Sequence, residues 1–300
     1  MPQSDGAKRL RMDMPKPPET PDLCRQAGWR SSGIDTRPAS PASAPPTGHM
    51  ATTVIIGTRN EGKLDEIRAL FNGWALKPNV MGLDELERTL NVPKKSLGDI
   101  PEPGTTYYEN AELKARALAK AIRDSNAVPF GNRFIIIADD SGLDIIGSVW
   151  KTGHEGTDYP KVRECTRLKG CVFPGVDTAP FAKACGGWTP DAFQLLVAAS
   201  GEDRRADAVT VLHALDVIMT ADGLLEMSSE SFRGDVKGYL VYPPRGENGF
   251  GYDPIFALSP EDGAQTFAQL SQEQKNANSH RGNALKLMCQ ESQALNRKKI

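Results

Sequence analysis

The chain has 300 residues, of which 39% are hydrophobic and 25% charged, and its formal net charge is −2. These values are typical of a soluble globular protein and argue against broad electrostatic binding of DNA or RNA, which needs a basic excess. No apolar run is long enough to cross a bilayer, no signal-peptide core is present, and five irregularly spaced cysteines favour a reduced cytoplasmic protein over a disulfide framework.

Residues 1–49 differ in composition from the rest of the chain. They contain nine of the 22 prolines, many Ser and Thr, and few large apolar residues. Such a segment cannot bury enough apolar surface to offset its ordering entropy, so we expect a disordered tail followed by one domain over residues 50–295. Its acidic residues argue against a transit peptide. Either the tail is dispensable or Met50, directly before the first predicted strand, is the true start.

The first predicted strand, residues 53–56, leads into the sequence GTRNEGKL at residues 57–64. This is G-x-x-x-x-G-K between a β-branched strand and an amphipathic helix from about Glu61, the arrangement of a phosphate-binding P-loop. Leu64, however, stands where a P-loop has the Ser or Thr that binds Mg²⁺. We therefore expect backbone amides and Lys63 to hold phosphates here, and the metal ligands to come from other segments.

A second helix is predicted to begin at Thr106, because Thr106 and Glu109 have the spacing of a capping box. Its apolar stripe runs to Ile122 and leaves Lys114 at the edge of the buried face. Glu102 lies in the loop before this helix. On its own Glu102 is an ordinary surface acid, but beside a second carboxylate it would form an oxygen-rich Mg²⁺ site.

The next predicted strand, in RFIIIADDSGLDI, ends abruptly at two adjacent acids, Asp139 and Asp140. Buried carboxylates are costly unless they meet a cation or take part in proton transfer, and open α/β sheets bind ligands at the carboxyl ends of their strands. The alternative is an Asp-Ser-Gly turn that only ends the strand. If the strand continues, the two side chains point to opposite faces, and one acid enters a given site.

The middle of the chain carries weaker signals. After a Gly-, Cys- and Lys-rich stretch at residues 147–187, a helix is predicted over residues 189–199. Strand-like runs follow at residues 208–215, 227–232 and 239–242. Early strands connected by helices and later strands spaced as hairpins predict an α/β fold with a mixed sheet. Structural zinc is not expected, because the candidate ligands fit no CxxC-type pattern. These ligands are His154, Cys165, Cys171 and Cys185.

The loop PPRGENGFGYDPIF, residues 243–256, combines glycines with aromatic and acidic side chains. Its glycines permit close approach of a ligand, Phe250 and Tyr252 can stack on a base, and Asp253 can accept from ring N–H groups. The alternative is a tight hairpin whose aromatic residues belong to the core.

A cluster of donors surrounds the start of the last predicted helix. Ser279 can cap this helix, and Lys275, His280 and Arg281 lie around its N-terminus. His280 alone is more often a structural residue. Three donors without a matching acid, at a helix end that attracts anions, favour a ligand.

Together these segments resemble the motifs of the inosine triphosphate/xanthosine triphosphate pyrophosphatase family. GTRNEGKLDEI, ENAELKA, ADDSGL, PRGENGFGYDPIF and EQKNANSHRGNALKL follow in family order over nearly four-fifths of the chain. The resemblance implies a homodimeric, Mg²⁺-dependent hydrolase that converts nonstandard purine nucleoside triphosphates (ITP, dITP, XTP) to the monophosphate and pyrophosphate, cleansing the nucleotide pool. It also implies an elongated mixed sheet with flanking helices and two lobes around a nucleotide cleft.

The resemblance assigns a role to individual residues. Asp140 matches the proton acceptor and a metal ligand, and Glu102 falls where a second metal carboxylate is expected. The substrate-binding positions are Thr58, Arg59, Asn60, Glu61, Gly62, Lys63, Lys114, Ser141, Phe250, Gly251, Tyr252, Asp253, Lys275, His280 and Arg281. The positions before Ser141 serve the phosphates, and those after it line the base pocket. On this basis Arg281→Ala should lower ITP hydrolysis and spare the fold.

The chain departs from the family pattern after Leu143. The segment FPGVDTAPFAKACGG follows after about twenty extra residues, an insertion around residues 147–172. Pro180 stands where the family has a basic residue, and Lys183 is the candidate replacement. Because the insertion adjoins the active centre, it could form a lid, alter the dimer surface or change substrate preference.

Two other functions compete with this one. A pyrophosphatase of pyrimidine or otherwise modified nucleotides would use a similar scaffold and differ in its substrates. A non-catalytic protein would bind ITP without releasing pyrophosphate, although the presence of Asp140, Glu102 and Lys63 argues against it. A P-loop ATPase is disfavoured, because Leu64 removes its metal ligand.

Overall fold

The computed structural model describes residues 52–71, 78–97, 100–125, 131–146, 173–261 and 263–296. All of them belong to one compact unit, residues 46–300. The predicted tail, Met50 and the insertion at residues 147–172 lie outside the described residues, as do His154, Cys165 and Cys171. Cys185 is a free thiol. None of the described helices is long and apolar enough to cross a membrane.

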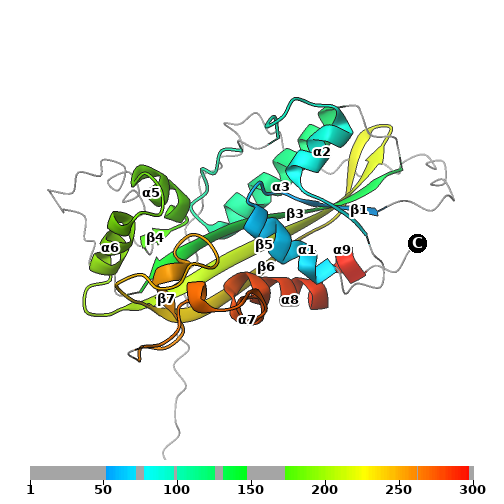
Figure 1. The fold of residues 1–300 in the computed structure, drawn as a ribbon. Coiled ribbons are helices and arrows are strands. Elements are labelled where there is room, and N and C mark those ends of the chain that lie inside the picture. Colours follow the sequence, from blue (N-terminus) through cyan, green and yellow to red (C-terminus); the bar gives the residue numbers. More distant parts are fainter. Residues whose placement is uncertain are drawn as a thin grey trace, which may run out of the picture. The chain divides into compact units, whose positions relative to one another are not determined.

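Strands and helices alternate along the described chain (Figure 1). The strands are β1 (Thr52–Ile56), β2 (Asn79–Met81), β3 (Arg133–Ile145), β4 (Phe173–Gly175), β5 (Arg205–Thr220), β6 (Gly223–Leu240) and β7 (Phe256–Ala257). The helices are α1 (Glu61–Phe71), α2 (Leu83–Leu90), α3 (Tyr107–Asp124), α5 (Thr178–Ala184), α6 (Pro190–Ala199), α7 (Gln272–Asn278), α8 (His280–Glu291) and α9 (Gln293–Asn296). Short 3₁₀ helices cover Asp253–Ile255 and Phe267–Gln269.

The seven strands form one mixed sheet, which confirms the predicted fold class. Their order is β2-β1-β3-β5-β6-β7, and β4 pairs with β3. β1 runs parallel to both β2 and β3, whereas β3, β5, β6 and β7 are successively antiparallel. The parallel pairs are joined through helices and the long β5–β6 pair is a hairpin, as the spacing of the apolar runs indicates.

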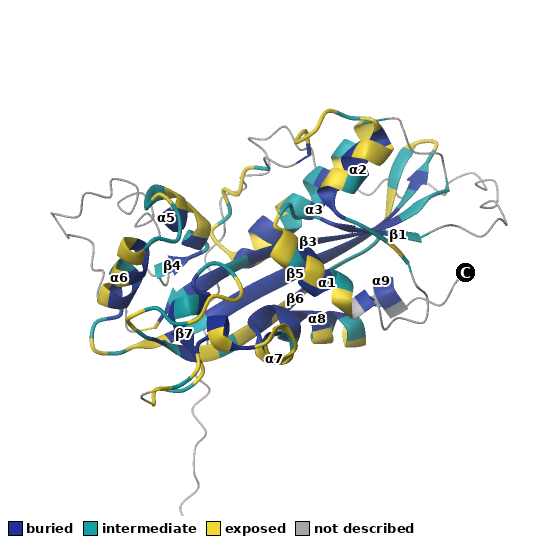
Figure 2. Cartoon of the chain, viewed as in Figure 1, coloured by how far each residue is buried: buried dark blue, intermediate teal, exposed yellow. Residues whose placement is uncertain are grey.

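The two faces of the sheet pack against different helices. In β3, Ile135 and Ile137 join a hydrophobic cluster with residues of α1 and α8. Phe134, Ile136 and Ala138 join another cluster with residues of α2 and α3. Figure 2 shows the central strands as buried along most of their length. Because side chains alternate along a strand, each position of β3 is assigned to one of the two helix layers.

The predicted helix starts are confirmed. Thr106 Oγ1 accepts a hydrogen bond from the Glu109 backbone N–H at 3.2 Å, and Glu109 Oε2 accepts in return from the Thr106 N–H at 3.1 Å. Thr189 caps α6, and Ser279 Oγ accepts from the N–H of the third residue of α8 at 3.0 Å. These caps are local interactions, and for that reason sequence spacing alone identifies them.

Two strand predictions are wrong. β3 does not end at Asp139 and Asp140 but continues to Ile145, because β5 pairs with it throughout and β4 joins it from Leu143. The runs predicted at residues 227–232 and 239–242 belong largely to one strand, β6, which ends at Leu240. Pairing with β5 along its whole length holds β6 together, although glycines interrupt its apolar pattern.

Candidate active site

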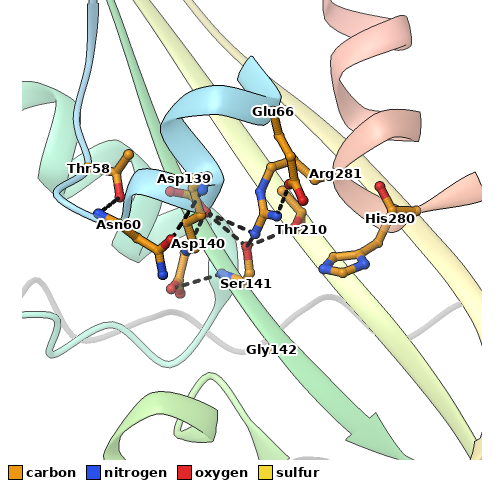
Figure 3. A network of polar contacts seen from close by, with 12 residues as sticks. Thr58, Asn60, Glu66, Asp139, Asp140, Ser141, Gly142, Thr210, His280 and Arg281 are labelled. Atoms are coloured by element: carbon orange, nitrogen blue, oxygen red, sulfur yellow. Dashed lines mark hydrogen bonds and ion pairs between the residues drawn. The ribbon is translucent and has the colours of Figure 1, made fainter. Parts of the chain in front are cut away.

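The candidate site lies in the middle of β3. β1 pairs with β3 as far as Ile137, and β4 pairs with it from Leu143. Between these points, residues 138–142 have β5 as their only strand partner within the described ranges. The loop before α1 and Arg281 of α8 lie beside β3 at this point (Figure 3). Asn110 and Lys114 of α3 also contact the strand here.

The adjacent acids of β3 face different helices. Asp139 forms an ion pair with Lys63 of α1, and Asp140 accepts a hydrogen bond from Asn110 of α3. Both residues are buried, with 4% and 5% of their surface exposed. In a continuing strand, adjacent side chains point to opposite faces, as the Asp139 and Asp140 side chains do here. The structure therefore offers two carboxylates with different surroundings.

Asp140 lies in a polar cluster on the α3 side. Asn110 Nδ2 donates to Asp140 Oδ2 at 3.0 Å, and Lys114 Nζ lies 3.5 Å from Asp140 Oδ1. The same Nζ lies 3.0 Å from Glu102 Oε2 and donates to the Asp139 backbone oxygen at 2.9 Å. The structure thus brings Glu102 and Asp140 to one ammonium group.

Burial raises the pKa of Asp140 to about 6, against the opposing effects of Lys114 and Asn110. The carboxyl is therefore ionised at neutral pH and is a stronger base than an exposed aspartate. Burial lowers the pKa of Lys114, but the three carboxylates of Asp140, Asp139 and Glu102 outweigh it and hold that pKa above its ordinary value. Lys114 is consequently a permanent cation at this site.

The oxygen atoms around Lys114 suit a divalent cation. Glu102 and Asp140 converge on its ammonium, which shows that their carboxylates can share one positive charge. Mg²⁺ is commonly bound by one or two carboxylates, with water and substrate phosphate completing its shell. Within the described ranges no group of three or more His, Cys, Asp or Glu residues is arranged to hold a metal. Glu102 and Asp140 are the carboxylate pair of this cluster that could hold such a cation.

Asp139 is a residue for which the sequence suggested no role, and it organises the other face. Lys63 Nζ lies 2.6 Å from Asp139 Oδ2, Ser141 Oγ donates to the same oxygen at 2.9 Å, and Arg281 lies 3.8 Å away. Burial raises the pKa of Asp139, but the cations Lys63, Arg281 and Lys114 outweigh it and depress the pKa well below the ordinary range. Asp139 is therefore a fixed anion, which suits it to hold lysines and not to accept protons.

A chain of buried charges extends from Arg281 towards the Gly-rich loop. Glu66 of α1 forms ion pairs with Arg281 and with Lys275, the latter at 3.3 Å. Lys275 Nζ also lies 2.7 Å from Asp253 Oδ2, which accepts from the Phe250 N–H at 2.7 Å. All four charged residues are at most 5% exposed. The predicted donors are thus brought together, but Glu66 and Asp253 supply the acids that the sequence analysis had not matched to them.

The predicted phosphate loop adopts the expected turn into α1. Thr58 Oγ1 accepts from the Asn60 N–H at 3.2 Å, and Asn60 Oδ1 accepts from the Lys63 N–H at 3.1 Å. Glu61 is exposed at the first position of the helix. Leu64, which stands where a P-loop has its metal-binding Ser or Thr, is buried in the hydrophobic core with residues of α8.

Arg59 does not point towards β3. Its guanidinium forms ion pairs with Asp84 and Glu87 of α2. Glu87 is buried and also accepts from the backbone N–H groups of Lys95 and Leu97, both at 2.9 Å. Arg59 therefore ties the phosphate loop to α2 and the segment after it, and it is not placed with the lysines.

The aromatic residues of this region fall into two groups. Phe250 lies at the site, and the others are buried in the core. The Phe250 ring lies 4.4 Å from Lys275 Nζ and 5.5 Å from the Arg281 guanidinium carbon, and a side chain on Gly62 would meet it at 2.9 Å. Phe250 thus borders both the phosphate loop and the cations. Gly251, in the left-handed region at φ +71°, makes the turn between Phe250 and Tyr252.

Tyr252 is buried and donates to the Gly142 carbonyl at 3.0 Å. The His280 ring lies between those of Tyr252 and Phe267, with both centroid distances 6.3 Å. Burial, together with Arg281 and Lys275, lowers the pKa of His280 well below its ordinary value, so the ring is neutral. Its Nδ1 and the Arg281 Nε are buried and have no hydrogen-bond partner within the described part of the chain. Unpaired buried groups of this kind are costly, so these two atoms are candidates for contact with a bound ligand or water.

Asn110 and Glu66 are site residues that were not predicted from the sequence. A signal was available in their spacing, because Asn110 precedes Lys114 by four residues and Glu66 follows Lys63 by three. Residues separated in this way share one face of a helix. Polar residues on the face of an identified lysine are therefore candidates for the same site.

Pro180 and Lys183 lie on α5. The Lys183 side chain is exposed, and no described contact joins it to β3 or to the lysines. The suggestion that Lys183 replaces the missing basic residue remains a prediction.

Comparisons with known proteins identify the family of this chain. The model of the Ham1 family matches residues 54–147 and 164–291. A dITP/XTP pyrophosphatase of Nitratidesulfovibrio vulgaris is 31% identical over 241 residues, which cover 78% of this chain and 92% of the relative. A dITP/XTP pyrophosphatase of Staphylococcus aureus is 32% identical over 236 residues, covering 78% and 93%. The solved Ham1 protein of S. aureus has a TM-score of 0.51 at 31% identity, covering 79% of this chain and 95% of that one. The chain therefore belongs to the Ham1 family.

Proposed function

We propose that this protein is a nucleoside triphosphate pyrophosphatase that hydrolyses ITP, dITP and XTP to the monophosphate and pyrophosphate. The observation that carries the proposal is that two lysines, Lys63 and Lys114, and the Glu102 carboxylate all gather around Asp139 and Asp140 of β3. Lys63 reaches the Asp139 side chain, Lys114 reaches its backbone oxygen, and Glu102 and Asp140 share the Lys114 ammonium. The relatives named dITP/XTP pyrophosphatase support the choice of substrate.

The phosphates would lie between the loop before α1 and the two lysines. Backbone amides at a helix N-terminus favour an anion, and Lys63 and Lys114 add positive charge. Asp139 holds both ammonium groups in place, through its side chain and its backbone oxygen. Lys63 is thus positioned before substrate arrives, and it needs little reorganisation when charge develops in the transition state.

Asp140 would act as the general base. Its carboxylate, ionised above pH about 6, accepts a proton from the water that attacks the α-phosphorus. A bond forms between the water oxygen and phosphorus, and the bond from phosphorus to the bridging oxygen breaks. The products are the nucleoside monophosphate and pyrophosphate. Asp139 cannot share this role, because its pKa is depressed and its oxygen Oδ2 is occupied by Lys63 and Ser141.

Glu102 and Asp140 are the residues that would hold Mg²⁺. When bound, Mg²⁺ would neutralise negative charge on the triphosphate. Lys114 faces the same two carboxylates, so its ammonium has to turn towards the phosphates as the cation binds.

Base selection is assigned to the buried cluster beside Phe250. Phe250 is placed to stack on a purine, and His280 and Arg281 carry the unpaired polar atoms. Arg281 Nε can only donate, which suits the 6-oxygen of hypoxanthine or xanthine. The 6-amino group of adenine would leave this donor unpaired in a buried site, a mismatch that discriminates strongly.

The test is pyrophosphate release from ITP, dITP, XTP, ATP and GTP, each with Mg²⁺ and with EDTA. We expect Mg²⁺-dependent release that is fastest with ITP, dITP or XTP, and no turnover by Asp140→Asn. A kcat/KM for ATP as high as that for ITP, or release of inorganic phosphate in place of pyrophosphate, would refute the proposed activity. Wild-type turnover by Asp140→Asn would remove Asp140 from the role of base.

The proposal extends to assembly, location and domain organisation. The family resemblance leads us to propose a cytoplasmic homodimer, with a catalytic domain over residues 50–295 and a dispensable tail before it. Light scattering of the full chain and of a variant starting at Met50 gives the mass of each. A monomer that retains full activity would contradict the assembly, and loss of activity on truncation would contradict the dispensable tail.

A further inference from the structure

Asn110 has a position in the site that none of the roles above explains. It lies in the first turn of α3, is 1% exposed, and uses both ends of its side-chain amide. Its Nδ2 donates to Asp140 Oδ2 at 3.0 Å, and its Oδ1 accepts from the Gly104 backbone N–H at 2.8 Å. One buried amide therefore joins β3 to the loop before α3.

The partners fix the orientation of this amide. The Gly104 N–H can only donate and the ionised Asp140 carboxylate can only accept, so the amide oxygen must face Gly104 and the nitrogen must face Asp140. The approach to the loop is also tight, because a Cβ on Gly104 would lie 2.5 Å from Asn110 Oδ1. A flipped amide would place its Nδ2 against the Gly104 N–H, two donors, and its Oδ1 against the Asp140 carboxylate, two acceptors.

The two segments joined by Asn110 carry the two carboxylates of the proposed metal site. Asp140 is a direct partner, and Glu102 lies two residues before Gly104. Glu102 is 42% exposed in its side chain and sits in a stretch without helix or strand. The capping box anchors the loop at Thr105 and Thr106 through Glu109, but it makes no contact with β3. Asn110 ties the backbone of this loop to Asp140, whereas Lys114 contacts the loop through the Glu102 side chain.

We propose that Asn110 is a positioning residue that sets the Glu102 and Asp140 carboxylates at the separation needed to share one divalent cation. The inference rests on the proposed function in that it assigns the cation to these two residues. An outer residue that orients a ligand in this way commonly contributes 10–100-fold to metal affinity. The loss of Asn110 should therefore weaken cation binding far more than nucleotide binding.

The primary measurement is the affinity of the full chain for Mn²⁺ without nucleotide, from the electron paramagnetic resonance signal of free Mn²⁺. Asn110→Ala should weaken Mn²⁺ binding at least about tenfold. Binding of ITP in EDTA, measured by calorimetry, should change less than about twofold, because the Asn110 side chain hydrogen-bonds to neither lysine. Asn110→Ser, which reaches neither partner, is a second variant that should behave in the same way if Asn110→Ala does not fold.

Thr106→Ala is the matched control. It removes the cap of the same helix beside the same loop, at a cost of about 1 kcal/mol, and it leaves the amide bridge in place. We expect its Mn²⁺ affinity to stay within about twofold of the wild type. In turnover, Asn110→Ala should lose kcat and regain part of it as Mg²⁺ is raised, which general damage to the fold would not produce.

Each outcome decides the inference. Wild-type Mn²⁺ affinity in the Asn110 variants overturns it, and so does an equal loss in Thr106→Ala, which would show that loop anchoring in general is responsible. The proposed function fails separately, if the wild type releases no pyrophosphate from any nucleotide. The Mn²⁺ measurement does not depend on that activity.

Discussion

Replacing Asp140, the proposed general base, should stabilise this protein while abolishing its turnover. The Asp140 carboxylate is buried on β3, and burial raises its pKa from an ordinary value of 3.8 to about 6. A folded-state pKa above the unfolded value means that the folded protein binds this proton more tightly. The associated stability is fully present below pH 3.8 and is lost as the pH rises through about 6. At pH 8 the buried anion therefore lowers the free energy of unfolding.

The pKa difference sets the size of the effect. A change of one in pKa corresponds to about 1.4 kcal/mol, so Asp140 lowers the free energy of unfolding by about 3 kcal/mol at pH 8. Asp140→Asn keeps the shape and a hydrogen-bond acceptor for Asn110 without the charge. The variant should be more stable than the wild type by about 1 kcal/mol at pH 4.5 and about 3 kcal/mol at pH 8. Lys114 retains Glu102 and the Asp139 backbone oxygen as partners.

Urea unfolding in EDTA at pH 4.5, 6 and 8, followed by circular dichroism, measures this difference. Asp124→Asn is a control with the same substitution and the opposite expectation. Hydrogen bonds from Lys120 and Arg123 lower the pKa of the exposed Asp124, so its removal should slightly destabilise the protein at pH 8. A gap between wild type and Asp140→Asn that does not grow with pH, or a less stable variant at pH 8, would refute the reasoning.

Three further predictions follow from contacts of the site. Arg281→Ala should abolish ITP hydrolysis and also cost roughly 3–5 kcal/mol in urea unfolding, because Glu66 loses a buried partner; unchanged stability would restore the expectation that the fold is spared. Gly142→Ala should lower stability by at least about 3 kcal/mol in the same assay, since its Cβ would lie 2.2 Å from the Gly175 oxygen, and a variant as stable as the wild type would contradict this packing. Lys114→Met should bind Mn²⁺ at least about tenfold more tightly without nucleotide, because repulsion between an ammonium and a dication about 4 Å apart costs about 2 kcal/mol even in water. Weaker Mn²⁺ binding by this variant would show that Lys114 does not compete with the cation.

The sequence predicted those parts of the site that depend on local spacing. The capping box of α3, the loop before α1 and the mixed sheet are as expected, because turns, caps and alternating patterns are encoded within a few residues. The sequence also grouped the Lys275, His280 and Arg281 donors. It did not predict that Glu66 of another helix pairs with Lys275 and Arg281, because an ion pair between distant segments leaves no local pattern.

The division of labour between the adjacent acids shows what each level determined. The sequence by itself determined that Asp139 and Asp140 stand side by side in a buried strand, and that alternation sends them to opposite faces if that strand continues. Only the tertiary structure decided that α1 and α8 bring Lys63 and Arg281 to Asp139, and that α3 brings Lys114 and Asn110 to Asp140. The first carboxyl is thereby held as a fixed anion and the second becomes a base with a pKa of about 6. Proton affinity depends on burial and on charges from distant segments, and those come together only when the helices pack on the sheet.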